Sequence, residues 1–220
     1  MNHPDVKAVI FDFGNVISRP QDSVAVSRMA EILGIPLSEF LPVYMRERHA
    51  YDRGVLSDAE YWERVRASFQ KGRSGSMHEL SATVIERLQE QDHRSWAQID
   101  DRMIGWARSL HERGILIAIL SNMPVSFYQS ILSRFEWIGM FDELIISGML
   151  RQLKPEPEIY QTALSRLRLT AGEAMFIDDL EPNIVAAEMI GMHALKYTDF
   201  ESLGQIITEK YGFEFPEGSR

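Results

Sequence analysis

Short apolar segments recur along the chain, and five of them have the composition of buried β-strands. None shows the polar–apolar alternation of a strand that has one face in water. Continuous apolar runs of this length are typical of strands covered on both faces, as in a parallel sheet. The predicted strands are 7–11, 115–120, 143–147, 174–177 and 193–197.

Helical patterns lie between the later strands. Segment 97–113 repeats apolar residues at helical spacing and is followed by Gly114, a residue that often ends helices. Segment 156–168 begins among prolines that suit a first helical turn, and 183–190 ends at Gly191. Alternating strands and helices predict an α/β fold: a Rossmann-like parallel sheet with helices on both faces and right-handed crossovers.

The long interval between the first two strands has a different pattern. It contains no convincing strand, and its amphipathic helical patterns are separated by glycine-containing breaks. We predict that 19–92 is an inserted helical bundle and that 1–18 and 93–220 together form the α/β core. The helices expected in the insert are 25–34, 38–54, 57–72 and 77–91, with breaks at 34–36, 54 and 72–75.

Composition narrows the possible functions. The 220 residues are 45% hydrophobic and 25% charged, which is ordinary for a globular protein. The net charge of -9 repels phosphate backbones and anionic lipid, so we expect neither nucleic acid nor membrane as a partner. The absence of cysteine excludes disulfides and thiolate metal sites. With no signal-peptide pattern and no apolar run near the roughly 20 residues of a membrane helix, we expect a soluble cytoplasmic protein.

Polar residues stand where an open α/β sheet binds its ligands, just beyond the carboxyl ends of strands. Taken singly, each is typical of a turn, a helix cap or a surface position. Together they offer three carboxylates, which suit Mg²⁺ better than zinc, and a lysine and a serine hydroxyl, which bind phosphate. These residues are Asp12, Ser121, Asn122, Lys154, Asp178 and Asp179.

This set of side chains predicts metal-assisted phosphoryl transfer. Asp12 is the candidate nucleophile. Mg²⁺ and Lys154 would neutralise the phosphoryl oxygens as they approach it. The cofactor expected from the residues is therefore Mg²⁺.

The segments VIFDFGNVI, ILSNMP, LKPEPEIYQTAL and MFIDDLEPNIVAAEMIGM resemble, in order, the four motifs of the haloacid dehalogenase-like (HAD) hydrolase superfamily. The resemblance covers essentially the whole chain. It implies that Asp12 becomes phosphorylated, that Ser121 donates a hydrogen bond to the phosphoryl group with Asn122 beside it, and that Lys154 is the motif-three lysine. The insert at 19–92 matches the family's small helical cap.

The resemblance also implies the metal site. Asp179 is the expected Mg²⁺ ligand, with Asp12, with Asp178 as a second acid and with the backbone carbonyl of Gly14. Asn183 stands where many members carry a further aspartate. The function implied is a Mg²⁺-dependent phosphatase for a small phosphorylated metabolite.

Gly14 is the departure from the family pattern. Most phosphatases of the superfamily carry a second aspartate here as general acid and base, a role typically worth about 10²–10⁴-fold in rate. FDxGNVI and DDxxxN resemble a subgroup that includes sugar-phosphate phosphatases of glucose-1-phosphate type. We hypothesise that the missing acid favours less basic leaving groups, such as anomeric or aryl phosphates, or that a cap residue or water supplies the proton.

Specificity is expected to come from the cap, whose stretch YMRERHAYDRG is rich in basic and aromatic residues. Within it, Tyr51 and Arg53 are the candidate specificity residues. Two alternatives stay open: a metal-independent dehalogenase, against which the pair Asp178 and Asp179 argues, and a binding or regulatory protein that has kept the fold. The sequence makes no prediction of oligomeric state.

Overall fold

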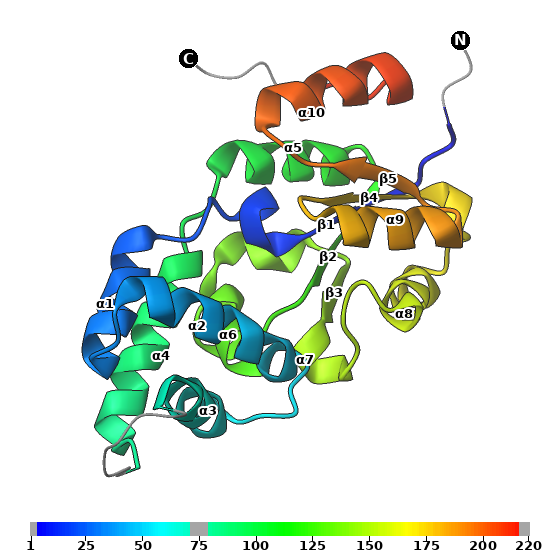
Figure 1. Cartoon of the computed structure of the whole chain (residues 1–220). Helices are drawn as coiled ribbons and strands as arrows, with labels where there is room; N and C mark the ends of the chain where they lie inside the picture. Colours follow the sequence, from blue (N-terminus) through cyan, green and yellow to red (C-terminus); the bar gives the residue numbers. More distant parts are fainter. Residues whose placement is uncertain (1–3, 71–78, 216–220) are drawn as a thin grey trace.

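A parallel sheet covered by helices lies beside a bundle of four helices (Figure 1). This computed structural model describes residues 4–70 and 79–215. The break predicted at 72–75 and the first residues of the helix predicted at 77–91 lie outside the described residues. The strands are β1 (Ala8–Phe11), β2 (Leu116–Ser121), β3 (Glu143–Ile146), β4 (Ala174–Asp178) and β5 (His193–Lys196).

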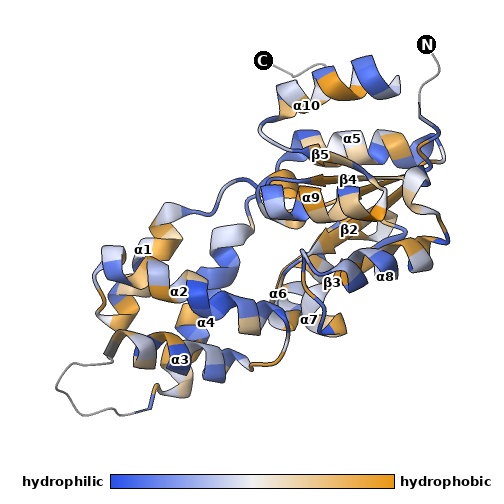
Figure 2. Ribbon diagram, turned by 45° about the vertical axis from the view of Figure 1, so that its right-hand side comes forward, coloured by the Kyte–Doolittle hydropathy of each residue, from blue (hydrophilic) through white to orange (hydrophobic). Residues whose placement is uncertain are grey.

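The sheet confirms the predicted α/β fold. All its strands pair in parallel, in the order β3-β2-β1-β4-β5. Successive residues of β1 point to opposite faces: Val9 and Phe11 join one core cluster, whereas Ala8 and Ile10 join another. Because both faces are buried, the strands are mostly apolar, and Figure 2 shows them mostly in the orange of hydrophobic residues.

Helices cover both faces of this sheet. One face packs against Trp106 of α5 and Phe200 of α10, the other against Tyr160 of α8 and Ile184 of α9. The helices of this part are α5 (Asp101–Glu112), α6 (Val125–Ser130), α7 (Ser147–Leu150), α8 (Pro157–Leu167), α9 (Glu181–Ile190) and α10 (Phe200–Ile206).

Helix α5 begins later than the predicted 97–113. The side chain of Asp100 accepts a hydrogen bond from the backbone N–H of Arg102 at 3.0 Å, which caps α5 at its first turn. The residues immediately before this cap belong to the end of α4 and to the link between the two helices.

The four helices between β1 and α5, which we call the cap helices, have a hydrophobic core of their own. Aromatic rings dominate it: Tyr51 and Tyr61 stack with centroids 4.2 Å apart, and Trp62 is fully buried. The assignment of 19–92 to a cap domain stays a prediction. Helix α4 continues beyond the predicted end of this domain at residue 92, to Trp96. The cap helices are α1 (Ser23–Leu33), α2 (Leu37–Asp52), α3 (Asp58–Gln70) and α4 (Ala82–Trp96).

Within the described part of the chain, no helix combines the length and apolar character needed to span a membrane.

The carboxyl end of α2 is packed tightly on α7. The hydroxyl of Ser147 donates a hydrogen bond to the backbone carbonyl of Asp52 at 2.6 Å. Gly54 follows with a φ of 73°, and a Cβ atom there would lie 2.2 Å from the carbonyl oxygen of Gly148. A glycine at 54 therefore lets the backbone of the cap meet the backbone of the core, which fixes where α2 lies over the sheet.

Gly54→Ala should lower the free energy of unfolding more than Gly34→Ala does. Both glycines have a positive φ, 73° and 65°, so both alanines incur a left-handed backbone cost of about 1–2 kcal/mol. Only the alanine at 54 also overlaps a neighbouring backbone, whereas nothing lies within 4 Å of the added Cβ at 34. Urea denaturation of both variants measures this, and equal losses would show that the α2–α7 contact yields freely.

Candidate active site

Three neighbouring strands deliver polar residues to one edge of the sheet. β1 ends just before Asp12, β2 ends at Ser121 and β4 ends at Asp178. Because β2, β1 and β4 are adjacent and parallel, their carboxyl ends lie together, beside a cavity of about 280 Å³. Of the predicted site residues, those that line this cavity are Asp12, Gly14, Ser121, Asn122, Lys154, Asp179 and Asn183.

Lys154 lies between two carboxylates. Its ammonium group, only 1% exposed, is 2.7 Å from Oδ1 of Asp12 and 2.7 Å from Oδ2 of Asp178. Burial lowers the pKa of Lys154, but the charges of Asp12 and Asp178 outweigh this effect and hold it above 10.5. Burial raises the pKa of Asp12 to about 7, and Lys154 opposes that rise. The lysine is therefore a fixed cation at this edge of the sheet.

Asp12 is oriented by its own turn as well as by the lysine. Its Oδ1 accepts a hydrogen bond from the backbone N–H of Phe13 at 2.6 Å, and its backbone N–H donates to the carbonyl of Ile177 at 2.8 Å. The same carboxylate thus caps the turn Phe13–Ile17 and contacts Lys154. The backbone N–H of Phe13 and the ammonium group of Lys154 both contact Oδ1. Asp12 can therefore cap the turn and still have a second oxygen that these two donors do not hold.

Asp178 is completely buried and fully engaged. It accepts hydrogen bonds from Nδ2 of Asn183 at 3.0 and 2.9 Å and from the backbone N–H of Leu180 at 2.8 Å, in addition to Lys154. Asp178 therefore positions Lys154, and Asn183 positions Asp178.

Asp179 points into the cavity instead. Its Oδ2 accepts a hydrogen bond from Nδ2 of Asn15 at 2.8 Å, and burial raises its pKa. One oxygen each of Asp12, Asp178 and Asp179 lies within 4.8 Å of the others, and a set of hard oxygen donors fits Mg²⁺. The sequence does not identify Asn15 as a site residue. Its one local signal is that asparagine tolerates a positive φ, and Asn15 adopts a φ of 58° here.

Gly14 faces an aromatic ring. Its φ and ψ, -64° and 129°, are open to any residue, so the backbone does not require glycine. A Cβ atom at this position would lie 3.5 Å from Cζ3 of Trp96, which enters the cavity wall from the end of α4. The ring of Trp96 is therefore in van der Waals contact with the position that a side chain at residue 14 would take.

Asn122 positions Lys154. Its Nδ2 donates to the backbone carbonyl of Lys154 at 2.9 Å, and its Oδ1 accepts from the backbone N–H of Lys154 at 2.9 Å. Ser121, beside it, is buried at the end of β2 and lines the cavity. The phosphate-binding role predicted for Asn122 stays a prediction, and the structure adds that it holds the lysine segment in place.

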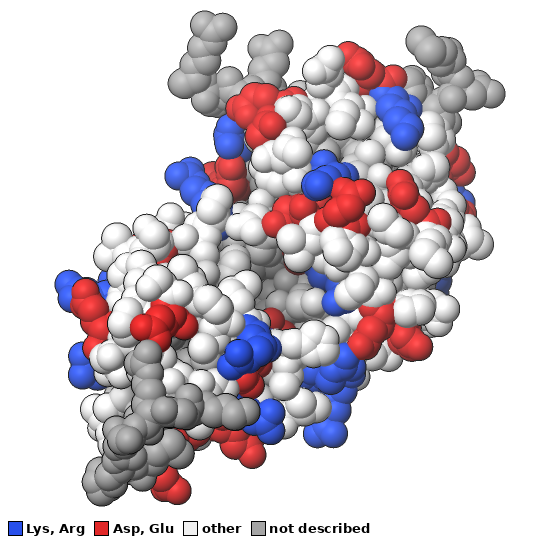
Figure 3. All heavy atoms as spheres, in the orientation of Figure 1, with Lys and Arg blue, Asp and Glu red and all other residues white. Residues whose placement is uncertain are grey.

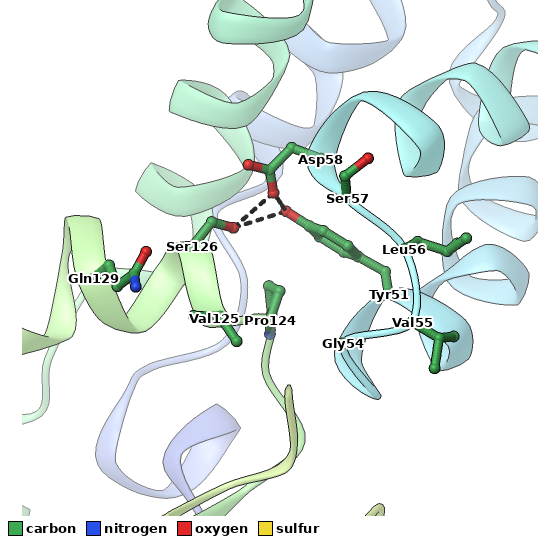
Figure 4. A pocket seen from close by; sticks show the side chains of 10 residues that line it. All are labelled: Tyr51, Gly54, Val55, Leu56, Ser57, Asp58, Pro124, Val125, Ser126 and Gln129. Atoms are coloured by element: carbon green, nitrogen blue, oxygen red, sulfur yellow. Dashed lines mark hydrogen bonds between the residues drawn. The ribbon is translucent and has the colours of Figure 1, made fainter. Parts of the chain in front are cut away.

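Tyr51 and Arg53 lie outside this cavity. The Tyr51 hydroxyl is hydrogen-bonded to Asp58 and to Ser126 beside a separate cavity of about 360 Å³, as Figure 4 shows. Arg53 pairs with Glu156 of the core. Both candidate specificity residues therefore tie the cap to the core, instead of facing the site.

The cap residues that do line the active-site cavity are Met45, Arg48, Asp52 and Trp96. Met45, Arg48 and Asp52 are three and four residues apart on α2 and so share one face of the helix, whereas Tyr51 and Arg53 point elsewhere. Helical spacing within YMRERHAYD could have separated these two faces, but the sequence does not show which face meets the core.

Arg48 is internally paired within the cap. Its Nη1 lies 2.7 and 2.8 Å from the two carboxylate oxygens of Asp92, and its Nε donates to Oδ1 of Asp52 at 3.1 Å. Burial raises the pKa of Asp52 to about 6 against the effect of Arg48. The charged groups that the cap contributes here are therefore already bonded to one another.

Lys154→Met should cost about 3–5 kcal/mol of unfolding free energy at pH 8, because it leaves two buried carboxylates without their cation. Lys154 opposes the rise of the Asp12 pKa to about 7, so without it the pKa of folded Asp12 is no lower, and the folded variant keeps a proton that the unfolded chain releases near 3.8. The variant therefore regains stability as pH falls from about 7 towards 3.8.

Denaturation at several pH values measures this effect. Lys196→Met is the matched control: its exposed pair with Glu181, at 3.0 Å, is worth at most about 1 kcal/mol. A cost for Lys154→Met that equalled this control, or did not change with pH, would contradict the buried ion pairs.

Comparisons with known proteins agree with this geometry. The sesquiterpene phosphatase AstK of Aspergillus oryzae is 27% identical over 194 residues, which cover 88% of this chain and 90% of that protein. The phosphoglycolate phosphatase of Aliivibrio fischeri is 23% identical over 93% of this chain and 89% of its own length.

A solved structure has the same fold. A HAD family enzyme of Bacteroides thetaiotaomicron, in complex with magnesium and inorganic phosphate, superposes with a TM-score of 0.67 at 18% identity and covers 90% of this chain and 98% of that one. The family model for haloacid dehalogenase-like hydrolases matches residues 6–191. This protein is therefore a member of the haloacid dehalogenase-like hydrolase family.

Proposed function

We propose that this hydrolase is a Mg²⁺-dependent phosphatase that cleaves a small phosphorylated metabolite through a phosphoryl-aspartate intermediate on Asp12. The observation that carries the proposal is the contact of Asp12 with Lys154 inside a cluster of three carboxylates. The phosphatases among the relatives, and the magnesium and phosphate bound by the structural neighbour, support it.

The metal ligands we propose are Asp12, Asp179 and the backbone carbonyl of Gly14. Asp178 is the third carboxylate of the cluster and lies behind them. Bound there, Mg²⁺ would neutralise negative charge on the phosphoryl oxygens and so reduce their repulsion of the Asp12 carboxylate. Asp178 acts mainly through Lys154, since its oxygens are already held by Lys154, Asn183 and Leu180.

In the first step, a carboxylate oxygen of Asp12 forms a bond to phosphorus while the ester P–O bond breaks. Lys154 and Ser121 donate hydrogen bonds to the phosphoryl oxygens. The departing alcohol takes a proton from water or from a cap residue such as Asp52, since Gly14 supplies none. Water then hydrolyses the acyl phosphate, which releases inorganic phosphate and restores the Asp12 carboxylate.

Asp12→Asn should abolish phosphate release from para-nitrophenyl phosphate, because the amide is not a nucleophile. EDTA should abolish the activity of the unmodified protein, and added Mg²⁺ should restore it. Asp101→Asn, on the exposed first turn of α5, is the control and should behave like the unmodified protein. Turnover that persists in Asp12→Asn would refute the mechanism, and EDTA-resistant release of halide from a 2-haloacid would favour the dehalogenase alternative.

Gly14→Asp should help poor leaving groups selectively. An acid at this position can protonate a departing alkoxide, an effect typically worth about 10²–10⁴-fold, and its Cβ would be in ordinary van der Waals contact with the ring of Trp96, 3.5 Å away. We expect kcat for alkyl phosphates to rise relative to aryl phosphates in Gly14→Asp but not in Gly14→Asn, which has the same shape and no acid. An identical leaving-group dependence in both variants would show that the missing acid does not shape the present activity.

A further inference from the structure

We infer that the substrate is a phosphate monoester of a small apolar alcohol, hydrocarbon or aromatic, instead of a sugar phosphate. This inference rests on the proposed phosphatase function and concerns the part of the same cavity that receives the alcohol. The resemblance of motifs one and four implies a sugar phosphate, whereas the cavity wall points to a different class.

The first observation is the composition of the wall. The exposed surface of the cavity is mainly apolar, although polar residues also line it, and hydrocarbon and aromatic side chains from both the core and the cap contribute to this surface. Apolar walls with few polar groups bind apolar ligands, because they remove hydrocarbon surface from water. The apolar residues are Phe13, Met45, Trp96, Met123, Phe127 and Leu180.

The second observation is the exposure of two of these residues. Met45 on α2 and Leu180 before α9 are each 54% exposed, although both are large and apolar. They reach the same cavity from opposite sides, one from the cap and one from the core. Figure 3 shows a hollow between these two parts, with mostly uncharged atoms around it. A ligand in the cavity could therefore cover their hydrocarbon surface and remove it from water.

The third observation is that several polar side chains of the wall are hydrogen-bonded within the protein. Arg48 holds Asp92 and Asp52, Asn122 holds the backbone of Lys154, and Asn183 holds Asp178. A sugar hydroxyl that meets these groups competes with an internal hydrogen bond, and one that meets the apolar wall loses its hydrogen bonds to water without replacement. Both outcomes disfavour a sugar relative to an apolar ring of the same size.

Trp96 adds to the argument at the reacting end. Its indole ring lies 3.5 Å from the position of a Cβ atom at residue 14 and lines the same cavity, so aromatic surface borders the reacting end. The cavity, at about 280 Å³, is close to the small end of ligand pockets, which hold about 300–1,000 Å³. Both features favour a compact alcohol such as a single ring or a short branched chain.

The test compares cyclohexylmethyl phosphate with glucose 6-phosphate. Both are phosphate esters of a primary alcohol on a six-membered ring, and they differ in ring oxygen and hydroxyl groups. We expect kcat/KM to be at least about tenfold higher for cyclohexylmethyl phosphate, since pocket contacts of this kind discriminate by about 10–200-fold. Equal values, or a preference for glucose 6-phosphate, would overturn the inference.

Variants of the rim assign the preference to the wall. Met45→Gln and Leu180→Asn keep the approximate side-chain size but add polar groups, and each should move the ratio of the two kcat/KM values towards one. Met189→Gln makes the same change on α9 at a side chain that is 84% exposed and does not line the cavity, so it should leave the ratio unchanged. If neither Met45→Gln nor Leu180→Asn changed the ratio of the two kcat/KM values, the inference would also be overturned.

Failure of the substrate class and failure of the proposed function give different results. Mg²⁺-dependent turnover of both esters that Asp12→Asn abolishes, without preference, would refute only the apolar class. No turnover of either ester or of para-nitrophenyl phosphate would refute the phosphatase itself.

Discussion

The contact on which the site depends is the buried ammonium group of Lys154 between Asp12 and Asp178. Parallel strands β1 and β4 are neighbours, so the carboxylates that follow them are forced together at a buried edge, where two like charges repel each other strongly. Lys154 removes this repulsion, and Asn122 fixes the segment that carries it. The arrangement keeps one oxygen of Asp12 bonded and leaves Asp179 directed at the cavity.

The cap completes the cavity through a single face of α2. Its place is fixed by the close backbone approach of Gly54 to Gly148 and by the hydrogen bond from Ser147 to Asp52. Met45 and Arg48 then line the active-site cavity, whereas the hydroxyl of Tyr51 is hydrogen-bonded to Ser126. The charged cap residues at the cavity, Arg48 and Asp52, are paired within the cap, and Met45 and Trp96 contribute apolar surface. This pairing connects the packing of the cap to the substrate class that we infer.

Gly14 and Trp96 are best understood together. The general acid typical of the family is absent at 14, and the ring of Trp96 borders the space that it would occupy. In the proposed phosphatase mechanism, a site without this side-chain acid would depend more on the leaving group than one that has it. An apolar wall around the leaving group also excludes water, which strengthens the electrostatic contacts at the phosphoryl end.

The sequence by itself determined the parallel sheet, because continuous apolar runs and the turns that end them are local properties of the chain. It also named the polar residues that the structure brings to one edge, because they directly follow strands or precede a helix. Only the tertiary structure decided which of those side chains face the cavity and which contact other side chains. Asp178 and Asp179 are adjacent in sequence, but neighbouring residues at a strand end point in different directions, so one is buried on Lys154 and the other faces the cavity. The face that α2 presents, and the meeting of Trp96 with Gly14, depend on how helices distant in the chain pack, and no local pattern encodes that packing.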